Sequence, residues 1–264
     1  MRKIKMIVAD LDNTLLRTDK TVSDYTVRVL NRCRERGIKI VFATARPARL
    51  AKYEHIIPDA IISDGGAVID CGEETIHKIL IENDTVNALI AKLKNSDKVG
   101  YLTVETGEYL LTNYKGAQIM DDLSTWNLVN TDFENKIDVP STKISVECKD
   151  KSWLEDLIKN YPELKIHGNT GEDRSQVYNS EVSKYRGVKI VAEYFNIPIE
   201  EIAAFGDDFI DVEMLENCGA GVAVANAIAE VKAAADYICD ANNNDGVAKW
   251  LEENILNLIT ERNG

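Results

Sequence analysis

The sequence predicts an α/β fold: a parallel β-sheet flanked by helices, with a smaller mixed α+β domain inserted into it. Three observations predict this fold. Short apolar runs alternate with helical patterns at both ends of the chain, as in β-α-β units. Between residues 82 and 182 this rhythm gives way to short segments of alternating polarity. Polar residues directly follow several of the apolar runs, where parallel sheets bind ligands.

The N-terminal part contains one clear β-α-β unit. Residues 4–9 form an apolar run rich in branched side chains, which is typical of a buried parallel strand. Ser23 is a helix cap, and apolar residues recur at helical spacing from there to Gly37. A second strand is expected at residues 38–43. Two further strands, at 60–63 and 67–70, are expected around the turn Asp64-Gly65-Gly66.

The middle and C-terminal parts differ in their patterns. The middle predicts helices near 86–93 and 153–160 and strands near 101–105, 143–148 and 176–178. The strand and helix rhythm then returns, with helices near 189–195, 212–216 and 247–259 and strands near 202–205 and 221–225. We therefore predict a core domain of residues 1–81 and 183–264 and an inserted domain of residues 82–182.

Composition limits the partners of this chain. Its 264 residues are 45% hydrophobic and carry a formal net charge of −13, which disfavours nucleic acid and anionic membrane surfaces. There is no apolar stretch long enough to cross a bilayer. The five cysteines are odd in number and never form a CxxC pair, so we expect reduced thiols and a cytoplasmic protein. The oligomeric state is left open.

Two acidic clusters follow predicted strands. Asp10 and Asp12 come directly after the first strand, and the segment from Asp207 to Asp211 follows a later one. Carboxylates at two strand ends suit Mg²⁺, which binds a few of them together with substrate phosphate. Any single aspartate here is also explained as a turn or cap residue.

A calcium loop of the EF-hand type is a further interpretation of the first cluster. Such a loop requires glycine at its sixth position and glutamate at its twelfth. This chain has Leu15 and Thr21 there, so the sequence excludes that alternative.

The same residues suit phosphoryl transfer. Asp10 is the candidate nucleophile, and Asp12 is the candidate acid and base for the leaving alkoxide and the attacking water. Thr44 is placed to donate to a phosphoryl oxygen, Lys184 to neutralise it, and Arg46 to bind phosphate or substrate. The structural alternatives are a helix cap for Thr44 and solvated surface positions for Lys184 and Arg46.

Four segments together carry a family resemblance. They are Asp10-Leu11-Asp12-Asn13-Thr14-Leu15, Ala43-Thr44-Ala45-Arg46-Pro47, Val182-Ser183-Lys184, and Gly206-Asp207-Asp208-Phe209-Ile210-Asp211-Val212-Glu213-Met214-Leu215. In this order they resemble the haloacid dehalogenase superfamily, specifically its Cof-type sugar-phosphatase branch. The resemblance implies a Rossmann-like core with an inserted α/β cap.

It also implies roles for individual residues. Asp10 is the nucleophile and Asp12 the general acid and base. Mg²⁺ is held by the Asp10 carboxylate, the backbone carbonyl of Asp12 and Asp207, with Asp211 as a supporting or water-mediated ligand. This chain departs from the family at two positions: Ala45 stands where glycine is usual, and Ile210 stands where asparagine is usual.

The function predicted is therefore a Mg²⁺-dependent phosphatase acting on phosphate monoesters of small metabolites, by family likeness sugar phosphates. Two alternatives stay open. A phosphomutase uses the same aspartyl-phosphate, and a catalytically silent module binds a phosphorylated metabolite without hydrolysing it. Four residues of the inserted region are candidates for the leaving-group surface or for purely structural roles: His167, Arg174, Tyr178 and Asn179.

Overall fold

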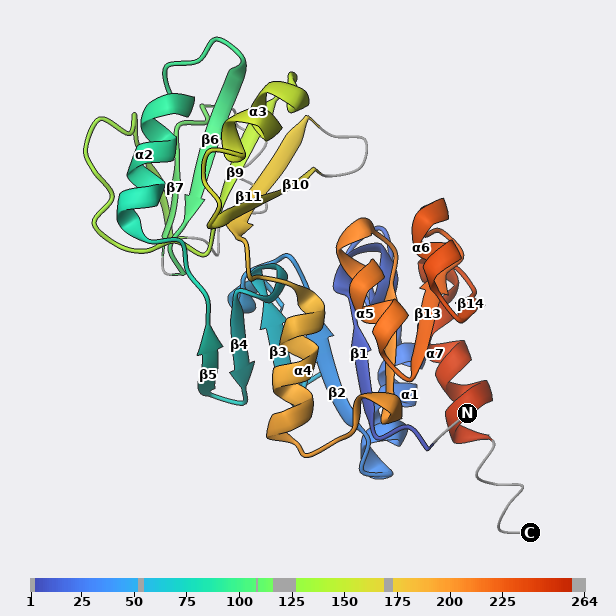
Figure 1. Ribbon diagram of the computed structural model, residues 1–264. Coiled ribbons are helices and arrows are strands. Elements are labelled where there is room, and N and C mark those ends of the chain that lie inside the picture. The colour runs from blue at the N-terminus through green and yellow to red at the C-terminus, as the bar shows by residue number, and fades with distance from the viewer. Residues whose placement is uncertain (1–2, 52–54, 108, 116–126, 169–172, 258–264) are drawn as a thin grey trace. The chain divides into compact units, whose positions relative to one another are not determined.

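The computed structural model describes residues 3–51, 55–107, 109–115, 127–168 and 173–257, which divide into two units (Figure 1). Unit 1 combines Met1–His77 with Ser183–Gly264, and unit 2 is Lys78–Val182. The predicted α/β fold class is confirmed, because unit 1 is built on a mostly parallel sheet with helices. That unit 1 is a catalytic core and unit 2 a cap stays a prediction.

The sheet of unit 1 has eight strands in the order β14-β13-β12-β1-β2-β3-β4-β5. Pairing is parallel from β14 to β3 and antiparallel between β3 and β4. The strands are β1 (Met6–Ala9), β2 (Lys39–Ala43), β3 (Ala60–Ser63), β4 (Val68–Cys71), β5 (Glu74–Lys78), β12 (Ile202–Gly206), β13 (Ala220–Val224) and β14 (Tyr237–Cys239). The sequence patterns missed β5 and β14, which are polar or short.

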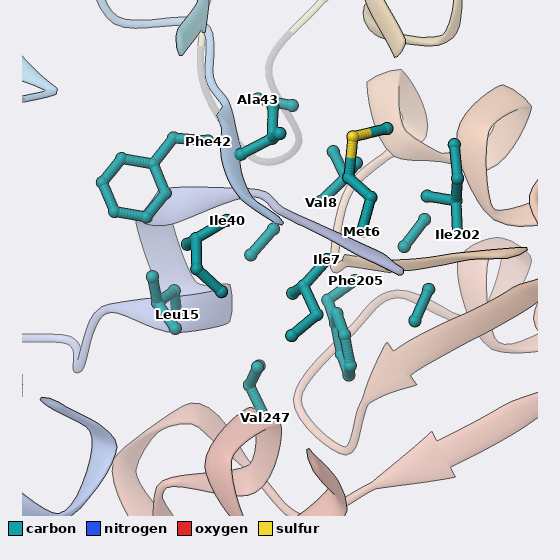
Figure 2. Close-up of a cluster of buried hydrophobic side chains, with 14 of the residues drawn as sticks. Met6, Ile7, Val8, Leu15, Ile40, Phe42, Ala43, Ile202, Phe205 and Val247 are labelled. Atoms are coloured by element: carbon teal, nitrogen blue, oxygen red, sulfur yellow. The ribbon is translucent and has the colours of Figure 1, made fainter. Parts of the chain in front are cut away.

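The central strands β1, β12 and β13 are buried on both faces of the sheet and are apolar throughout. Figure 2 shows Met6 and Val8 on one side of β1 and Ile7 on the other. On the Ile7 side, the ring of Phe205 packs against Trp250 at a centroid distance of 5.4 Å. Burial of each such apolar side chain contributes about 1.5–3 kcal/mol.

The described residues of unit 1 form five α-helices, besides short helical turns: α1 (Asp24–Glu35), α4 (Lys184–Tyr194), α5 (Val212–Asn217), α6 (Ala229–Ala234) and α7 (Gly246–Leu251). Helix α1 begins at its predicted cap, where the Ser23 side chain accepts from the Thr26 N–H. Helix α4 begins five residues earlier than predicted, because Ser183 caps it by accepting from the Arg186 N–H. Lys184 is therefore the first residue of a helix and not part of a loop.

Unit 2 contains a six-stranded sheet in the order β10-β11-β9-β6-β7-β8. Its strands are β6 (Val99–Glu105), β7 (Tyr109–Thr112), β8 (Asn127–Asn130), β9 (Lys143–Cys148), β10 (Leu164–Gly168) and β11 (Arg174–Asn179). All pairs are antiparallel except β7 with β8. Helices α2 (Asn83–Leu93) and α3 (Lys151–Ile158) belong to the same unit.

The two faces of the unit 2 sheet differ in polarity. Directly paired residues share a face, and one such row crosses four strands as Val104, Ile144, Val177 and Ile166. This apolar face packs with buried residues of α2 and α3 into one core. The adjacent row lies on the opposite face and is polar: Thr112, Thr103, Ser145, Gln176 and His167.

The described residues include no helix that is both long and apolar enough to span a membrane. All five cysteines are free and buried.

Gly66 sets how closely the turn after β3 approaches the start of α4. Its φ is +109°, and a Cβ at this position would collide with the Ser183 carbonyl. Gly72 also has positive φ, at +63°, but a Cβ there meets nothing within 4 Å. Substitutions at the two glycines therefore separate the effect of the close contact with Ser183 from the effect of a positive φ.

We expect Gly66→Ala to lower the free energy of unfolding by about 3 kcal/mol or more, since strain and a backbone clash add. Gly72→Ala, the matched control, should lower it by only about 1 kcal/mol. Urea titration followed by circular dichroism measures both. Equal losses in the two variants would show that the contact with Ser183 does not matter.

Candidate active site

Three strands of unit 1 end together and carry the predicted site residues. β1 lies between β12 and β2 with Ala9 opposite both Phe205 and Phe42, so the three carboxyl ends meet at one edge. Asp10 follows β1 and donates its N–H to the Phe205 carbonyl at 3.0 Å. Thr44 and Asp207 follow the ends of β2 and β12. The convergence expected from the sequence is thus present in the fold.

Lys184 is the cation at the centre of this edge. Its side chain is 1% exposed, and Nζ donates to Asp10 Oδ1 and to Asp211 Oδ1, both at 2.6 Å. Burial alone lowers the pKa of Lys184, but the two carboxylates outweigh burial and raise it above its ordinary value. The alternative of a solvated surface lysine is therefore wrong.

Asp211 connects the lysine to the backbone of the acidic loop. Its Oδ1 accepts from Lys184, and its Oδ2 accepts from the N–H groups of Asp207 at 3.0 Å and Asp208 at 3.2 Å. Both carboxylate oxygens are thus engaged by protein donors. This geometry suits a residue that supports the site, as the family resemblance implies for Asp211, better than a direct metal ligand.

The carboxylates of Asp10, Asp207 and Asp211 form a compact cluster. One oxygen of each lies within 4.8 Å of the others. Burial raises the pKa of Asp10 well above its usual range although Lys184 opposes the shift. Burial, and next the charge of Asp211, raise the pKa of Asp207 to about 7. These shifts reflect negative charges held close together in a partly dry environment.

This donor set fits a hard divalent cation. Among the described residues no protein donor bonds Asp10 Oδ2 or Asp207 Oδ2, so one carboxylate oxygen on each residue is available. All candidate ligands are oxygens, and no thiol or imidazole joins the cluster within the described residues. Mg²⁺ takes such ligands, whereas zinc sites favour nitrogen and sulfur.

A residue that the sequence patterns did not single out completes the cluster. The Thr14 hydroxyl donates to Asp207 Oδ1 at 2.8 Å and thereby links the two acidic segments. Thr14 is 1% exposed, four residues after Asp10. Its burial and its partner are set by the fold, so the sequence offered no local signal for this contact.

Asp12 lies in a different environment from Asp10. The Arg46 guanidinium donates from Nε to Oδ2 and from its terminal nitrogen to Oδ1, both at 2.6 Å. Lys20 Nζ donates to the same Oδ1 at 2.6 Å. Burial by itself raises the pKa of Asp12, but these hydrogen bonds outweigh burial and lower it. Asp12 is held ionised, and Lys20 is a second site residue that sequence reasoning missed.

Thr44 is buried, with 1% of its surface exposed. Its hydroxyl oxygen accepts from the Arg46 N–H at 3.1 Å, which leaves the hydroxyl proton to be donated. The helix after Pro47, which Thr44 would have capped, is a single turn, Ala48–Leu50, and no side chain caps it. The alternative role of Thr44 as a helix cap is therefore wrong.

Lys184 does not need a polar side chain at position 210. Asp10 and Asp211 fix its ammonium group, so Ile210 in place of the family's asparagine leaves the lysine in position. The structure gives Ala45 no distinct consequence.

The four residues of unit 2 that the sequence suggested for the leaving-group surface lie in different surroundings. Asn179 donates from Nδ2 to the Leu80 carbonyl at 3.0 Å, which is a structural role. The Tyr178 hydroxyl donates to Gln176 Oε1, and its ring lies 6.1 Å from that of His167. Arg174 is an exposed residue of β11.

Comparison with known proteins gives consistent matches over most of the chain. A family model described as haloacid dehalogenase-like hydrolase matches residues 7–251. The 5-amino-6-(5-phospho-D-ribitylamino)uracil phosphatase YitU of Bacillus subtilis (strain 168) is 27% identical, with 94% of this chain and 96% of that protein covered. A putative phosphatase of Haemophilus influenzae is 29% identical, with coverage of 94% and 97%.

The solved structures lead to the same family. A haloacid dehalogenase-like hydrolase from B. subtilis matches with a TM-score of 0.83 at 26% identity, covering 95% of this chain and all of that chain (100%).

Removal of the buried ammonium group tests the electrostatics of this site. We expect Lys184→Met to lower the free energy of unfolding by about 3–5 kcal/mol, because it leaves Asp10 and Asp211 buried without their cation. Lys159→Met is the matched control: Lys159 pairs with Asp156 at 2.7 Å, but its side chain is 75% exposed. It should leave stability unchanged within error. Comparable losses in both variants, measured by urea titration, would contradict the central role of Lys184.

Proposed function

The chain belongs to the family of haloacid dehalogenase-like hydrolases, and we propose that it is a Mg²⁺-dependent phosphatase that forms an aspartyl-phosphate on Asp10. The observation that carries the proposal is the contact of Asp10 with Lys184 at the carboxyl end of β1. It leaves one oxygen of a buried carboxylate for attack while a neighbouring cation offsets part of the negative charge.

The reaction proceeds in two displacements. Asp10 Oδ2 attacks phosphorus, the bond from phosphorus to the ester oxygen breaks, and the departing alkoxide takes a proton from Asp12. Water then attacks the phosphoryl group, Asp12 takes the proton of that water, and the bond from phosphorus to Asp10 breaks. Dividing the reaction suits phosphate monoesters, whose uncatalysed hydrolysis is among the slowest known.

Asp12 must exchange partners during this cycle. The hydrogen bonds from Arg46 and Lys20 favour its carboxylate form, which is the form that accepts a proton from water. Protonation of the leaving alkoxide requires the protonated form. We infer that Arg46 and Lys20 move away from Asp12 when substrate binds, which leaves both cations for the incoming anion.

Lys184 and Thr44 supply the remaining stabilisation. The Lys184 ammonium has a third proton beyond those given to Asp10 and Asp211, and the Thr44 hydroxyl retains its own. Both groups are buried, where a donor aimed at developing charge is worth more than in water. They are the candidates to hold the phosphoryl oxygens.

Asp207 would hold the metal through Oδ2, together with the Asp12 backbone carbonyl that the family resemblance implies. Asp10 would contribute Oδ1, which has a second lone pair besides the one that accepts from Lys184, so that Oδ2 stays available to attack phosphorus. When bound, Mg²⁺ supplies positive charge that reduces the repulsion between the nucleophile and the phosphate. Asp211 would act through the loop that it bonds, and Thr14 would orient Asp207.

We propose small phosphorylated metabolites with hydroxylated leaving groups, such as sugar phosphates, as substrates. The name of the relative YitU, a phosphatase of a phosphoribityl compound, supports this class. The polar row on the unit 2 sheet supports it too, since the Ser145 hydroxyl bonds no other described residue. Unit 2 would then be the cap that selects the leaving group. The five free thiols support a reducing compartment, the cytoplasm.

A phosphate-release screen over phosphorylated metabolites, with Mg²⁺ or with EDTA, tests the reaction. We expect release only with the metal, and a loss of at least about 10,000-fold in kcat for Asp10→Asn. Asp19→Asn, an exposed aspartate in the following loop, is the control. Undiminished activity in Asp10→Asn would exclude the mechanism. Tight binding of a metabolite without release would favour a binding module, and transfer of phosphate to a sugar would favour a mutase.

Substitution of Ser145, in the polar row of the unit 2 sheet, tests the proposed substrate class. We expect Ser145→Ala to raise KM for sugar phosphates about three- to tenfold, the effect of one lost hydrogen bond. The KM for para-nitrophenyl phosphate, whose leaving group has no hydroxyl for Ser145, should not change. Ser152→Ala on helix α3 is the matched control, since that hydroxyl bonds Asp150. An equal effect of Ser145→Ala on both substrates would contradict leaving-group selection by this row.

A further inference from the structure

Asn13, between Asp12 and Thr14, has a left-handed backbone conformation and is bonded from outside its own loop. Its φ is +59°, in the region that asparagine adopts more readily than most residues other than glycine. Its carbonyl oxygen accepts from Asn226 Nδ2 at 2.7 Å. Asn226 lies two residues beyond β13, 213 positions away along the chain. A distant amide therefore holds the peptide that joins Asn13 to Thr14, next to the candidate acid and base.

Asn226 is itself fixed by a second asparagine. Its Oδ1 accepts from the Asn242 N–H at 2.9 Å, and Asn242 Nδ2 donates to the Leu16 carbonyl at 3.0 Å. Asn242 is buried, with 4% of its surface exposed. The two side chains thus hold the Asp10 loop at both Asn13 and Leu16.

The same turn also holds the acidic loop of the site. The Ile228 N–H, two residues after Asn226, donates to the Asp207 carbonyl at 3.1 Å. Thr14, the residue after Asn13, donates to Asp207 Oδ1 at 2.8 Å. Residues 226–228 therefore bind the Asp10 loop through a side chain and the Asp207 loop through the backbone. A shift of Asn13 would move the Thr14 hydroxyl relative to Asp207.

We propose that Asn226, supported by Asn242, is a positioning residue that sets the distance between the nucleophile loop and Asp207. The inference rests on the proposed function for its effect on turnover, but its geometry concerns only the carboxylate cluster. Asn226 touches no reacting group in this arrangement: it acts through the Asn13 peptide and Thr14. None of the four family-like segments contains it.

Two substitutions at Asn226 separate its two hydrogen bonds. Asn226→Ala removes both of them. Asn226→Asp is nearly isosteric and keeps an acceptor for the Asn242 N–H, but it has no donor for the Asn13 carbonyl. Asn217→Ala is the matched control, because Asn217 is also an exposed asparagine that donates from Nδ2 to a backbone carbonyl, that of Glu213 at 2.8 Å.

The readouts are kcat and KM for para-nitrophenyl phosphate at saturating Mg²⁺, the thermal midpoint by circular dichroism, and Mg²⁺ binding to metal-free protein by calorimetry. We expect both Asn226 variants to lose at least about tenfold in kcat, because small displacements of catalytic groups have large effects. KM should stay within about twofold, since Asn226 contacts neither Thr44 nor Lys184. Asn226→Ala should bind Mg²⁺ several-fold more weakly, and Asn217→Ala should match wild type in every readout.

A purely structural role would lower the thermal midpoint and leave the kcat of the folded protein unchanged. The inference is overturned if kcat in both Asn226 variants stays within twofold of wild type. Should Asn226→Ala fail to fold, the isosteric Asn226→Asp decides by kcat. If wild type releases no phosphate at all, the proposed function fails, and the positioning role is then judged by Mg²⁺ binding alone. It is overturned if the folded Asn226→Ala variant binds Mg²⁺ with wild-type affinity. If only Asn226→Asp folds, the affinity of that variant is used instead.

Discussion

The buried contact of Lys184 with Asp10 and Asp211 is the constraint on which the rest of the site depends. Moving an ammonium group out of water is strongly unfavourable unless opposite charges meet it at hydrogen-bond distance. Three separate segments must therefore converge: the end of β1, the start of α4 and the loop after β12. Once they do, the three positions are mutually fixed, because none of the charges tolerates burial alone.

Close backbone packing follows from that convergence. Ser183 caps α4 and turns Lys184 inward, and Gly66 leaves room for the Ser183 carbonyl. Gly206 is similarly required, since a Cβ there would overlap the Asp211 side chain that bonds the next two N–H groups. Glycine is thus required at these two positions because the charged cluster needs the space that a Cβ would fill, and not because the chain must be flexible there. The charges of the site can pair only because the backbone packs closely at this edge of the sheet.

Much of this arrangement could be predicted from the sequence, and most exceptions depend on the tertiary fold. The apolar runs at β1 and β3 and the capping Ser23 are local signals, so strands and helix were found close to their bounds. Thr14 and Lys20 were missed because the fold decides which acid each of them meets. The early start of α4 was missed although its cap, Ser183, is a local signal like Ser23. The hydrogen bond of Thr14 to Asp207 spans 193 positions, and no local pattern encodes it. Residue type identified the charged groups, while only the fold identified which charges meet.

The pairing of these charges bears on how the site accepts a phosphate dianion. Among the described residues, three cations pair with the four acids Asp10, Asp12, Asp207 and Asp211, namely Lys20, Arg46 and Lys184. This set of side chains formally presents an excess of negative charge to an anionic substrate. A divalent cation reverses the sign of that excess, and local ions commonly dominate the field of such sites. Metal and substrate should therefore bind cooperatively, each reducing the repulsion that the other faces. The same reasoning accounts for Arg46 and Lys20: they pair with the partly exposed Asp12 carboxylate, and under the proposed function an incoming anion would displace them.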